Sequence, residues 1–384
     1  MQPKALLLPN LTPLRGLAAL LVVAVHFNGI VIHLPFSSTN MFLNKSYLMV
    51  DLFFIMSGFI ILHNYGSEFK DLVGWRSYLK YLRARFARIY PLHFFTFLIL
   101  VIIIYFSLNP YLSGPLTTLI NNPKAIITHL LLLQSFGFHE IYTWNVPSWS
   151  ISAEWFAYLL FPFLTLFMAR YKSFALFLLT VLVIALYVLI VYVIPRPTSP
   201  WDMPNNHDIN VSYEFGYIRG LAGFTTGMLV YKFYQTKKLL HFLSQDWVGA
   251  ACVFALIYTM SKGILDLFYI PLLSLVVLSL VANKSSINKV LMLRPLQYIG
   301  EISYSIYMWH YLLILNCVVP MLEKIGFDYK GPGTINPPPH QGIALCIIFL
   351  LLVIFISSLT YEYIEKPWRK RLNGKKTNIT KKTG

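Results

Sequence analysis

The sequence predicts an all-α protein: a polytopic integral membrane bundle of about ten transmembrane helices, with a short re-entrant or interfacial segment near 125–138. Composition supports this class, because hydrophobic residues make up 57% of the 384 residues and charged residues only 12%. Several uncharged runs also have the length of about 20 residues that a helix needs to cross a bilayer. A soluble domain of this size would not need so much apolar sequence.

The order of the apolar segments predicts the topology. They fall at 14–34, 47–64, 89–107, 125–138, 149–169, 173–194, 213–232, 247–261, 265–282, 297–320 and 341–363. The segment at 125–138 is short, and such runs more often form re-entrant or interfacial segments than spans. Ten spans then remain, with both termini on one side. That side is predicted to be cytoplasmic because most of the 31 basic residues fall on it. The exceptions are Lys45, Lys124, Arg196, Arg219, Lys262, Lys324 and Lys330.

Charge and cysteine usage narrow the classes of partner. The net charge is +16, but the basic residues cluster between apolar segments and in the tail, which indicates contact with a lipid bilayer and no nucleic-acid partner. Three cysteines lie singly in apolar runs without metal-site spacing, so no metal is expected. We expect the chain to divide into a transmembrane domain at 1–366 and a basic cytoplasmic tail at 367–384, with no C-terminal extracytoplasmic domain.

The first apolar segment contains two ionisable residues, Arg15 at its start and His26 in its middle. Such groups are costly inside a membrane and are therefore functional candidates. Eleven residues correspond to roughly 16 Å along a helix and leave the two side chains roughly 20° apart around its axis. Both should lie on one face, with Arg15 at the membrane surface and His26 about halfway through the bilayer.

The segment VDLFFIMSGFII carries Asp51 at its outer end and Ser57 next to Gly58 in its middle. Ser57 and Gly58 permit close approach of a neighbouring helix, and we also place Ser57 with the donor-binding residues. Asp51 could cap its helix or orient a histidine. The sequence leaves both roles open.

Arg85 and Arg88 lie at the end of the basic stretch RSYLKYLRARFARIYPLHFF. They are three residues apart and so are neighbours on a helix surface. Basic residues here anchor the cytoplasmic side, but they also suit a polyphosphate, since arginine binds phosphate with two hydrogen bonds. Both readings stay open on the sequence alone.

Glu154 lies in a polar stripe with Ser150 and Tyr158, spaced four residues apart on an otherwise apolar helix. A carboxylate in this position needs a partner. Glu154 is therefore either a catalytic acid or half of a structural pair with another helix.

A second polar stripe runs through IGEISYSIYMWHYLLI, where Ser303, Tyr307 and His310 share one helix face. We place Tyr307 and His310 with the residues that line the donor pocket. The alternative for His310 is a packing role in the helix core.

Six motifs occur in order between residues 11 and 367. They are Arg15 and His26 in LRGLAALLVVAVHF, then VDLFFIMSGF, RARFARIYP, PSWSISAEWFAYLLFP, YSIYMWH and YEYIEKP. As an ordered set they resemble the membrane acyltransferase 3 family, whose members include O-antigen, peptidoglycan and Nod-factor O-acetyltransferases.

This resemblance implies an acyl-CoA donor from the cytoplasm, with acetyl-CoA as the family default. The implied acceptor is a sugar hydroxyl of a cell-surface polysaccharide or glycolipid, such as the O-antigen of lipopolysaccharide, and the implied location is the bacterial inner membrane. By the same resemblance His26 is catalytic, Arg15, Arg85 and Arg88 act on the donor side, and Glu154 is the acid of its motif. Many relatives add an extracytoplasmic domain, so the need for a separate extracytoplasmic partner protein stays open.

The expected mechanism is direct attack, in which His26 removes the proton from an acceptor hydroxyl. Glu154 or Asp51 would fix the tautomer of its imidazole. An acyl-histidine intermediate is the mechanistic alternative. A transporter or flippase of a glycan or glycolipid is the alternative function, since it too places charges inside helices. The sequence shows no inverted repeat that would favour it.

Overall fold

The computed structural model describes residues 8–32, 41–106, 122–194, 208–284, 286–326 and 337–372, and their regular structure is helical throughout. The longer helices are α1 (Leu11–Phe27), α2 (Met49–Tyr65), α3 (Trp75–Tyr105), α6 (Trp149–Tyr192), α7 (Gly216–Gln235), α9 (Asp246–Lys262), α10 (Tyr269–Ala282) and α15 (Pro339–Thr360). The shorter ones are α5 (Ala125–Leu130), α8 (Leu240–Leu243), α11 (Ser286–Leu291), α12 (Arg294–Glu301), α13 (Ser303–Leu313), α14 (Val319–Lys324) and α16 (Lys366–Leu372). Single π-helical turns, η1 (Asn28–Ile32), η6 (Ile314–Val318) and η7 (Tyr361–Glu365), extend α1, α13 and α15.

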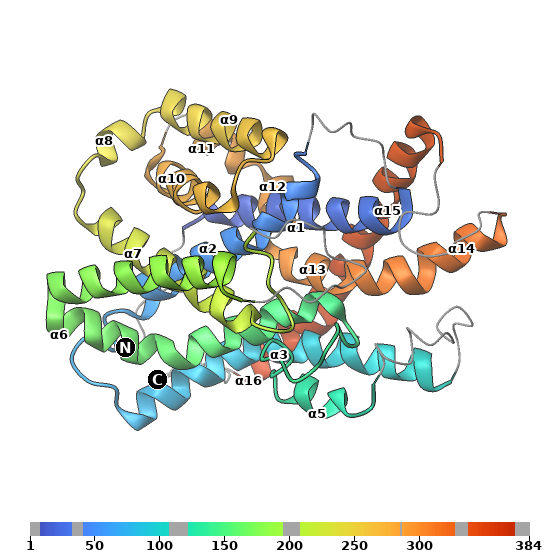
Figure 1. Ribbon diagram of the computed structural model, residues 1–384, viewed down its shortest axis with the longest axis horizontal. Helices are drawn as coiled ribbons and strands as arrows, with labels where there is room; N and C mark the ends of the chain where they lie inside the picture. The colour runs from blue at the N-terminus through green and yellow to red at the C-terminus, as the bar shows by residue number, and fades with distance from the viewer. Residues whose placement is uncertain are drawn as a thin grey trace, which may run out of the picture.

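The protein is an all-α, multi-pass membrane bundle, as predicted. Helices α1, α3 and α6 run roughly along a common direction, and α15 crosses them obliquely (Figure 1). Within the described ranges, six segments are long and apolar enough to cross a membrane: Leu11–Ile32, Asn44–Tyr65, Trp75–Tyr105, Val146–Tyr192, Ser303–Lys324 and His340–Leu372. The number of ten spans stays a prediction, because helices such as α9, with 17 residues, fall short of these criteria.

The segment predicted to be re-entrant or interfacial contains only the six-residue helix α5. At about 1.5 Å per residue this helix is roughly 9 Å long, far too short to cross a bilayer. It ends where Leu132 takes a left-handed conformation with φ of 57°. The segment therefore does not span the membrane.

Helix α6 accounts for two of the predicted spans. It is 44 residues long, but Lys172 in its middle has φ of 44° and ψ of −117°, which breaks the helix. In Figure 1 the two green arms run back alongside each other from this bend. The sequence predicted the same division, at 149–169 and 173–194.

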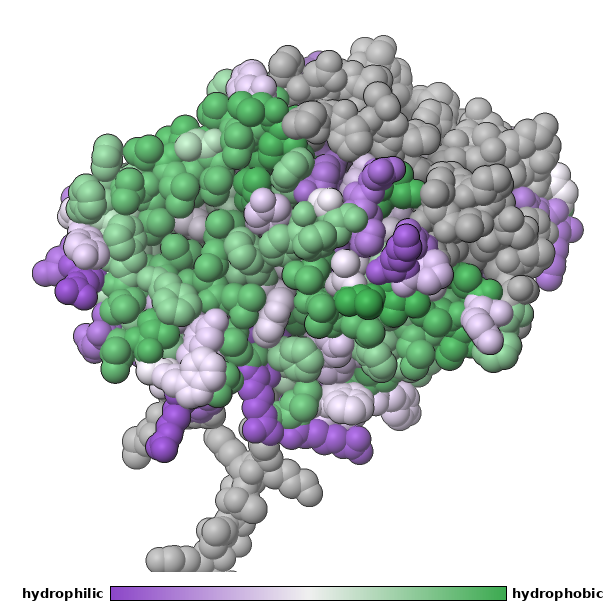
Figure 2. All heavy atoms as spheres, turned by 60° about the horizontal axis from the view of Figure 1, so that its bottom comes forward, coloured by the Kyte–Doolittle hydropathy of each residue, from purple (hydrophilic) through white to green (hydrophobic). Residues whose placement is uncertain are grey.

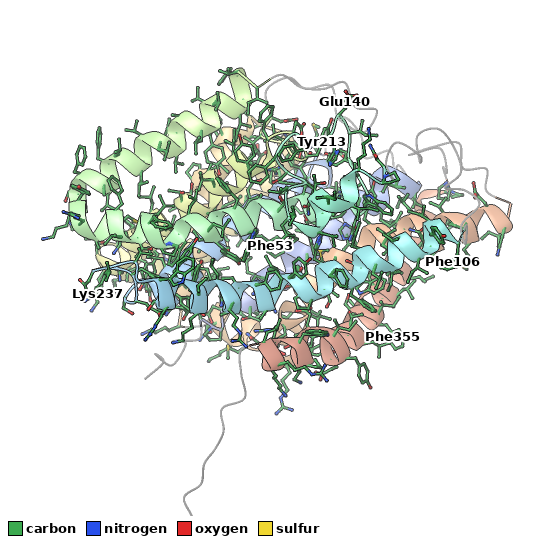
Figure 3. The ribbon with its side chains drawn as sticks, turned by 90° about the horizontal axis from the view of Figure 1, so that it is seen from below. Phe53, Phe106, Glu140, Tyr213, Lys237 and Phe355 are labelled. Atoms are coloured by element: carbon green, nitrogen blue, oxygen red, sulfur yellow. The ribbon has the colours of Figure 1, made fainter. Side chains whose placement is uncertain are left out.

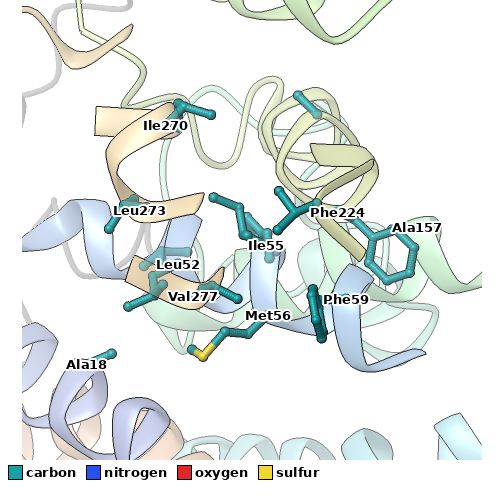
Figure 4. Close-up of a cluster of buried hydrophobic side chains, with 14 of the residues drawn as sticks. Ala18, Leu52, Ile55, Met56, Phe59, Ala157, Phe224, Ile270, Leu273 and Val277 are labelled. Carbon is teal, nitrogen blue, oxygen red and sulfur yellow. The ribbon is translucent and has the colours of Figure 1, made fainter. Parts of the chain in front are cut away.

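The core of the bundle forms around α2, where apolar side chains of α1, α2, α7 and α10 converge (Figure 4). Two glycines let α2 and α7 touch backbone to backbone. A Cβ atom at Gly58 would lie 1.9 Å from the Phe224 carbonyl oxygen, and one at Gly227 would lie 2.0 Å from the Ile55 carbonyl oxygen. The predicted close approach at Gly58 is therefore real, and it fixes which way neighbouring Ser57 faces.

Glycines also let α1 and α12 touch backbone to backbone. A Cβ atom at Gly300 would lie 2.0 Å from the Thr12 carbonyl oxygen, and one at Gly16 would lie 2.7 Å from the Gly300 nitrogen. This contact brings Arg15 on α1 next to Gln297 and Glu301 on α12. All three side chains line the cavity described below.

The outer surface is suited to lipid. Figure 2 shows a broad apolar face, with hydrophilic residues mainly toward its margins. Large apolar side chains such as Phe177, Phe254 and Phe355 are exposed on the surface of the bundle. Figure 3 places Lys237 and Phe106 at opposite ends of the bundle and Phe53 near its middle.

Candidate active site

A cavity of about 540 Å³ lies where α1, α2, α3, α6, α12 and α13 meet. Its walls combine apolar side chains with a concentration of charge that is unusual for a membrane bundle. Of the residues predicted as site residues, the structure brings six together on this wall: Arg15, Ser57, Arg85, Arg88, Glu154 and Tyr307. They come from five helices and from positions up to 292 residues apart in the sequence.

Glu154 joins α6 to α2 inside the cavity. Its Oε1 atom accepts hydrogen bonds from Ser57 Oγ at 2.7 Å and from Tyr158 Oη at 2.5 Å. Arg15 is close enough for electrostatic attraction to the same carboxylate. Glu154 thus connects α6 to α2 and is also part of the cavity wall.

Two of the arginines are held in place by neighbours. Arg85 donates a hydrogen bond to Tyr65 Oη at 3.0 Å, and its guanidinium lies 5.0 Å from the centre of the Tyr65 ring. Arg88 forms an ion pair with Glu365, with 3.1 Å between Nη1 and Oε2. Arg15, in contrast, makes no hydrogen bond or ion pair with the described residues.

His26 and His310 form a pair outside the cavity lining. His26 Nδ1 lies 2.8 Å from the Val22 carbonyl oxygen and 3.2 Å from His310 Nε2. His310 Nδ1 lies 2.6 Å from the Tyr307 carbonyl oxygen. His310 is fully buried, whereas His26 is partly exposed.

These contacts determine which ring nitrogen carries hydrogen in His26 and in His310 when both rings are neutral. A carbonyl oxygen only accepts, so His310 Nδ1 carries hydrogen and its Nε2 is an acceptor. His26 Nδ1 then faces two acceptors, the Val22 carbonyl and His310 Nε2, and must itself carry hydrogen. The Nε2 atom of His26 has no hydrogen-bond partner among the described residues, so its lone pair is in the state required of a general base.

Tyr307 connects the cavity to the histidine pair. Its side chain lines the cavity, while its carbonyl oxygen accepts the hydrogen bond from His310. The Tyr307 hydroxyl donates to the Pro147 carbonyl at 3.0 Å and accepts from Ser150 Oγ at 2.8 Å. The Phe53 ring packs edge-on against Tyr307, with ring centres 6.1 Å apart. A ligand arm that extends from the cavity to His26 must pass this layer.

Comparison with known proteins identifies the family. The chain matches the family described as "Acyltransferase domain" over residues 9–358. It belongs to this acyltransferase family. The resemblance drawn from the ordered motifs is therefore confirmed, and it extends over nearly the whole chain.

Curated relatives in the family share moderate identity with this chain. Acyltransferase MdmB of Streptomyces mycarofaciens is 36% identical over 167 residues, which cover 42% of this chain and 40% of that protein. Peptidoglycan O-acetyltransferase OatA of Listeria monocytogenes is 24% identical over 390 residues, covering 94% of this chain and 56% of that protein. O-acetyltransferase OatA of Staphylococcus aureus is 24% identical over 400 residues, with 95% and 57% covered. The chain thus matches little more than half the length of either OatA protein. No solved structure matches it significantly.

The expected role of Asp51 in this family member needs correction. Both of its carboxylate oxygens accept hydrogen bonds from Arg219, at 3.0 Å from Nε and 2.6 Å from Nη2, and both side chains are fully buried. Asp51 therefore neither caps α2 nor contacts His26. Glu154 does not contact His26 either, since its hydrogen bonds go to Ser57 and Tyr158. The tautomer of His26 is fixed by the Val22 carbonyl and His310 instead.

His310 also differs from expectation, because it contacts His26 and does not line the cavity. Two further residues were missed by sequence reasoning. Glu365, which holds Arg88, is the last acid of the motif YEYIEKP, and the motif was recognised without a role for that acid. Arg219 was visible as a lone arginine in the apolar segment 213–232, where only a buried carboxylate could balance it.

Among the described residues, no group of three or more His, Cys, Asp or Glu side chains is placed to hold a metal.

Proposed function

We propose that this protein is a membrane O-acyltransferase that moves an acyl group from acyl-CoA to a sugar hydroxyl of a cell-surface polysaccharide or glycolipid. Membership of the acyltransferase family supports the reaction class. The OatA relatives support an acetyl group and a glycan acceptor, since they are named as O-acetyltransferases and one acts on peptidoglycan. Acetyl-CoA is the donor that fits these names, and O-antigen is one acceptor of this chemical class.

The observation that carries the proposal is the geometry of α1. One face of this helix presents Arg15 to the cavity, and eleven residues further on it presents His26 with a free Nε2. The separation is roughly 16 Å along the axis, comparable to the extended pantetheine arm of acyl-CoA. A donor with its phosphates at Arg15 would thus bring its thioester to His26.

In the proposed reaction, His26 Nε2 removes the proton from the acceptor hydroxyl while the oxygen attacks the thioester carbonyl. The carbon–sulfur bond then breaks, and the leaving thiolate takes the proton back from the imidazolium. The products are the sugar ester and free CoA thiol, so the histidine is regenerated. The Nδ1–H bonds to the Val22 carbonyl and to His310 orient the ring and stabilise its positive charge.

An acyl-histidine intermediate is the second mechanism that this geometry permits, because the same free Nε2 could attack the thioester. Ping-pong kinetics, or acylated His26 trapped without acceptor, would show the intermediate. A strict ternary-complex pattern would support direct transfer.

The proposed setting is the bacterial cytoplasmic membrane, with both termini and the cavity mouth in the cytoplasm. This follows from the side on which most basic residues fall. The proposed transmembrane domain is 1–366. Of the predicted basic tail at 367–384, residues 373–384 lie outside the described part of the chain. Whether a separate extracytoplasmic protein assists acceptor binding is a matter for reconstitution with purified components.

The test is thiol release from acetyl-CoA by purified protein in the presence of candidate glycans. We expect acceptor-dependent release that falls by about 10²- to 10⁴-fold in His26→Ala, the usual contribution of a general base. His241→Ala is the matched control, since this histidine is exposed and outside the cavity lining. Full release by the His26 variant would remove this residue from the mechanism. Glycan movement without donor consumption would instead indicate a transporter or flippase.

A further inference from the structure

Four arginines line the cavity, and their surroundings differ. Arg85 and Arg88 are held by Tyr65 and Glu365, as described above. Arg15 and Arg369 line the same cavity but make no hydrogen bond or ion pair with the part of the chain that the structure describes. Glu365 neutralises Arg88, but Arg85 is bonded only to a neutral hydroxyl and its buried Nε has no hydrogen-bond partner among the described residues. Arg15, Arg85 and Arg369 thus keep positive charge for a ligand, and of these Arg15 and Arg369 have no hydrogen bond to the described residues.

Arg369 reaches the cavity from α16, which directly follows the π-helical turn η7. This turn carries Glu365, so the segment that fixes Arg88 also positions Arg369. Arg369 is only partly exposed, and it is close enough to Arg88 and Arg15 to be repelled by both, a repulsion that attraction to Glu365 offsets only in part. A partly buried guanidinium close to other guanidiniums lowers the stability of the fold unless an anion binds beside it.

The balance of charge on the wall also favours an anion. The lining contains four arginines but only two glutamates, Glu154 and Glu301. Glu365 is already committed to Arg88 and to Ser305, whose hydroxyl donates to it at 2.5 Å. The excess of positive charge is therefore left for a ligand, and arginine forks fit phosphate with two hydrogen bonds.

Acyl-CoA carries two separate anionic groups, a diphosphate next to the pantetheine arm and a phosphate on the ribose at the far end. The spacing of Arg15 and His26 on α1 assigns the diphosphate to Arg15. Helix α16 comes after the 22-residue helix α15 and lies on the predicted cytoplasmic side. We infer that Arg369 binds the ribose phosphate of the donor and so makes this site selective for CoA over dephospho-CoA. This inference rests on the proposed function.

The experiment is equilibrium binding of CoA and of dephospho-CoA to the full chain in lipid nanodiscs, without acceptor. We expect Arg369→Gln to weaken CoA binding about 10- to 100-fold, the effect of one charge-assisted contact, and to leave dephospho-CoA binding nearly unchanged. Arg369→Lys should retain part of the preference. The matched control is Arg371→Gln on the same helix, because Arg371 stacks on Trp368 and does not line the cavity.

Equal losses for both ligands, or no loss for CoA, would overturn the assignment of Arg369. If His26-dependent thiol release is present at the same time, the proposed function stands and only this inference fails. Wild-type protein that binds neither ligand would overturn both the acyl-CoA donor and the role of Arg369. Unchanged thermal unfolding of the variants is the check that the fold is intact.

Discussion

The bundle contains two charged regions that differ in whether opposite charges are paired. In the region around Asp51, which we call the buried ion-pair region, Arg219 pairs with Asp51 and both side chains have no exposed surface. Nearby, Asp266 accepts hydrogen bonds from Lys45 Nζ at 2.5 Å, from the Tyr47 hydroxyl, and from the Ile209 backbone nitrogen at 3.0 Å. In these two pairs each buried carboxylate is matched by a positive charge.

The cavity has the reverse arrangement, with more guanidiniums than carboxylates, and Arg15, Arg85 and Arg369 form no ion pair with the described residues. Removing one partner of a buried ion pair costs much free energy of folding, but the pair is already neutralised and does not attract a ligand. Unmatched charges on a cavity wall keep their attraction for one. An ionisable residue inside the bundle is expected to be structural where an opposite charge neutralises it and to bind a ligand where no such charge does.

The largest effect that would sharpen this comparison is on stability. Arg219→Ala should lower the free energy of unfolding by about 3–5 kcal/mol, because it leaves Asp51 as an uncompensated buried charge. Thermal unfolding of purified protein, with Lys238→Ala as the exposed control, measures this. Donor binding by the fraction that remains folded should be unchanged. A stable Arg219→Ala protein that has lost donor binding would contradict the division into two kinds of region.

The histidine pair lies between these extremes, with one ring buried and one partly exposed. His310→Ala should lower kcat by about a hundredfold with little change in donor KM, because misplacement of a catalytic group by about 1 Å has a cost of this size. His310→Gln should recover part of the loss, since its amide oxygen can accept the hydrogen of His26 Nδ1. A change confined to KM would show that His310 belongs to donor binding after all.

Much of the fold could be predicted from the sequence, because membrane helices are read from length and hydropathy alone. The division of α6 at Lys172 and the short α5 segment are both visible as interruptions in apolar runs. The cavity residues were also predictable, since Arg15, Arg85, Arg88 and Glu154 are ionisable residues inside or beside spans. Their cost in a membrane marks them out without any knowledge of packing.

The sequence could not predict which charged side chains form ion pairs with each other. Asp51 and Arg219 are 168 residues apart, and Arg88 and Glu365 are 277 apart. Such pairings depend on how helices are arranged around each other, and apolar patterning does not encode this arrangement. The same limit explains the error over His26, because a local carbonyl at Val22 and a distant His310 replaced the carboxylate that was expected.

The smallest expected effect tests whether the cavity wall is built with redundancy. Ser57→Ala removes one of the two hydroxyls that donate to Glu154 Oε1, while Tyr158 keeps the other bond. The free energy of unfolding should fall by only about 1 kcal/mol, the usual net value of one hydrogen bond, and donor KM should change by less than the variants of Arg369 change it. Ser261→Ala, at a partly exposed position of α9 where the hydroxyl bonds the Ile257 carbonyl of its own helix, is the control. A loss of several kcal/mol would mean that Glu154 depends on Ser57 alone, and the cavity would then resemble the buried ion-pair region in its sensitivity to a single missing partner.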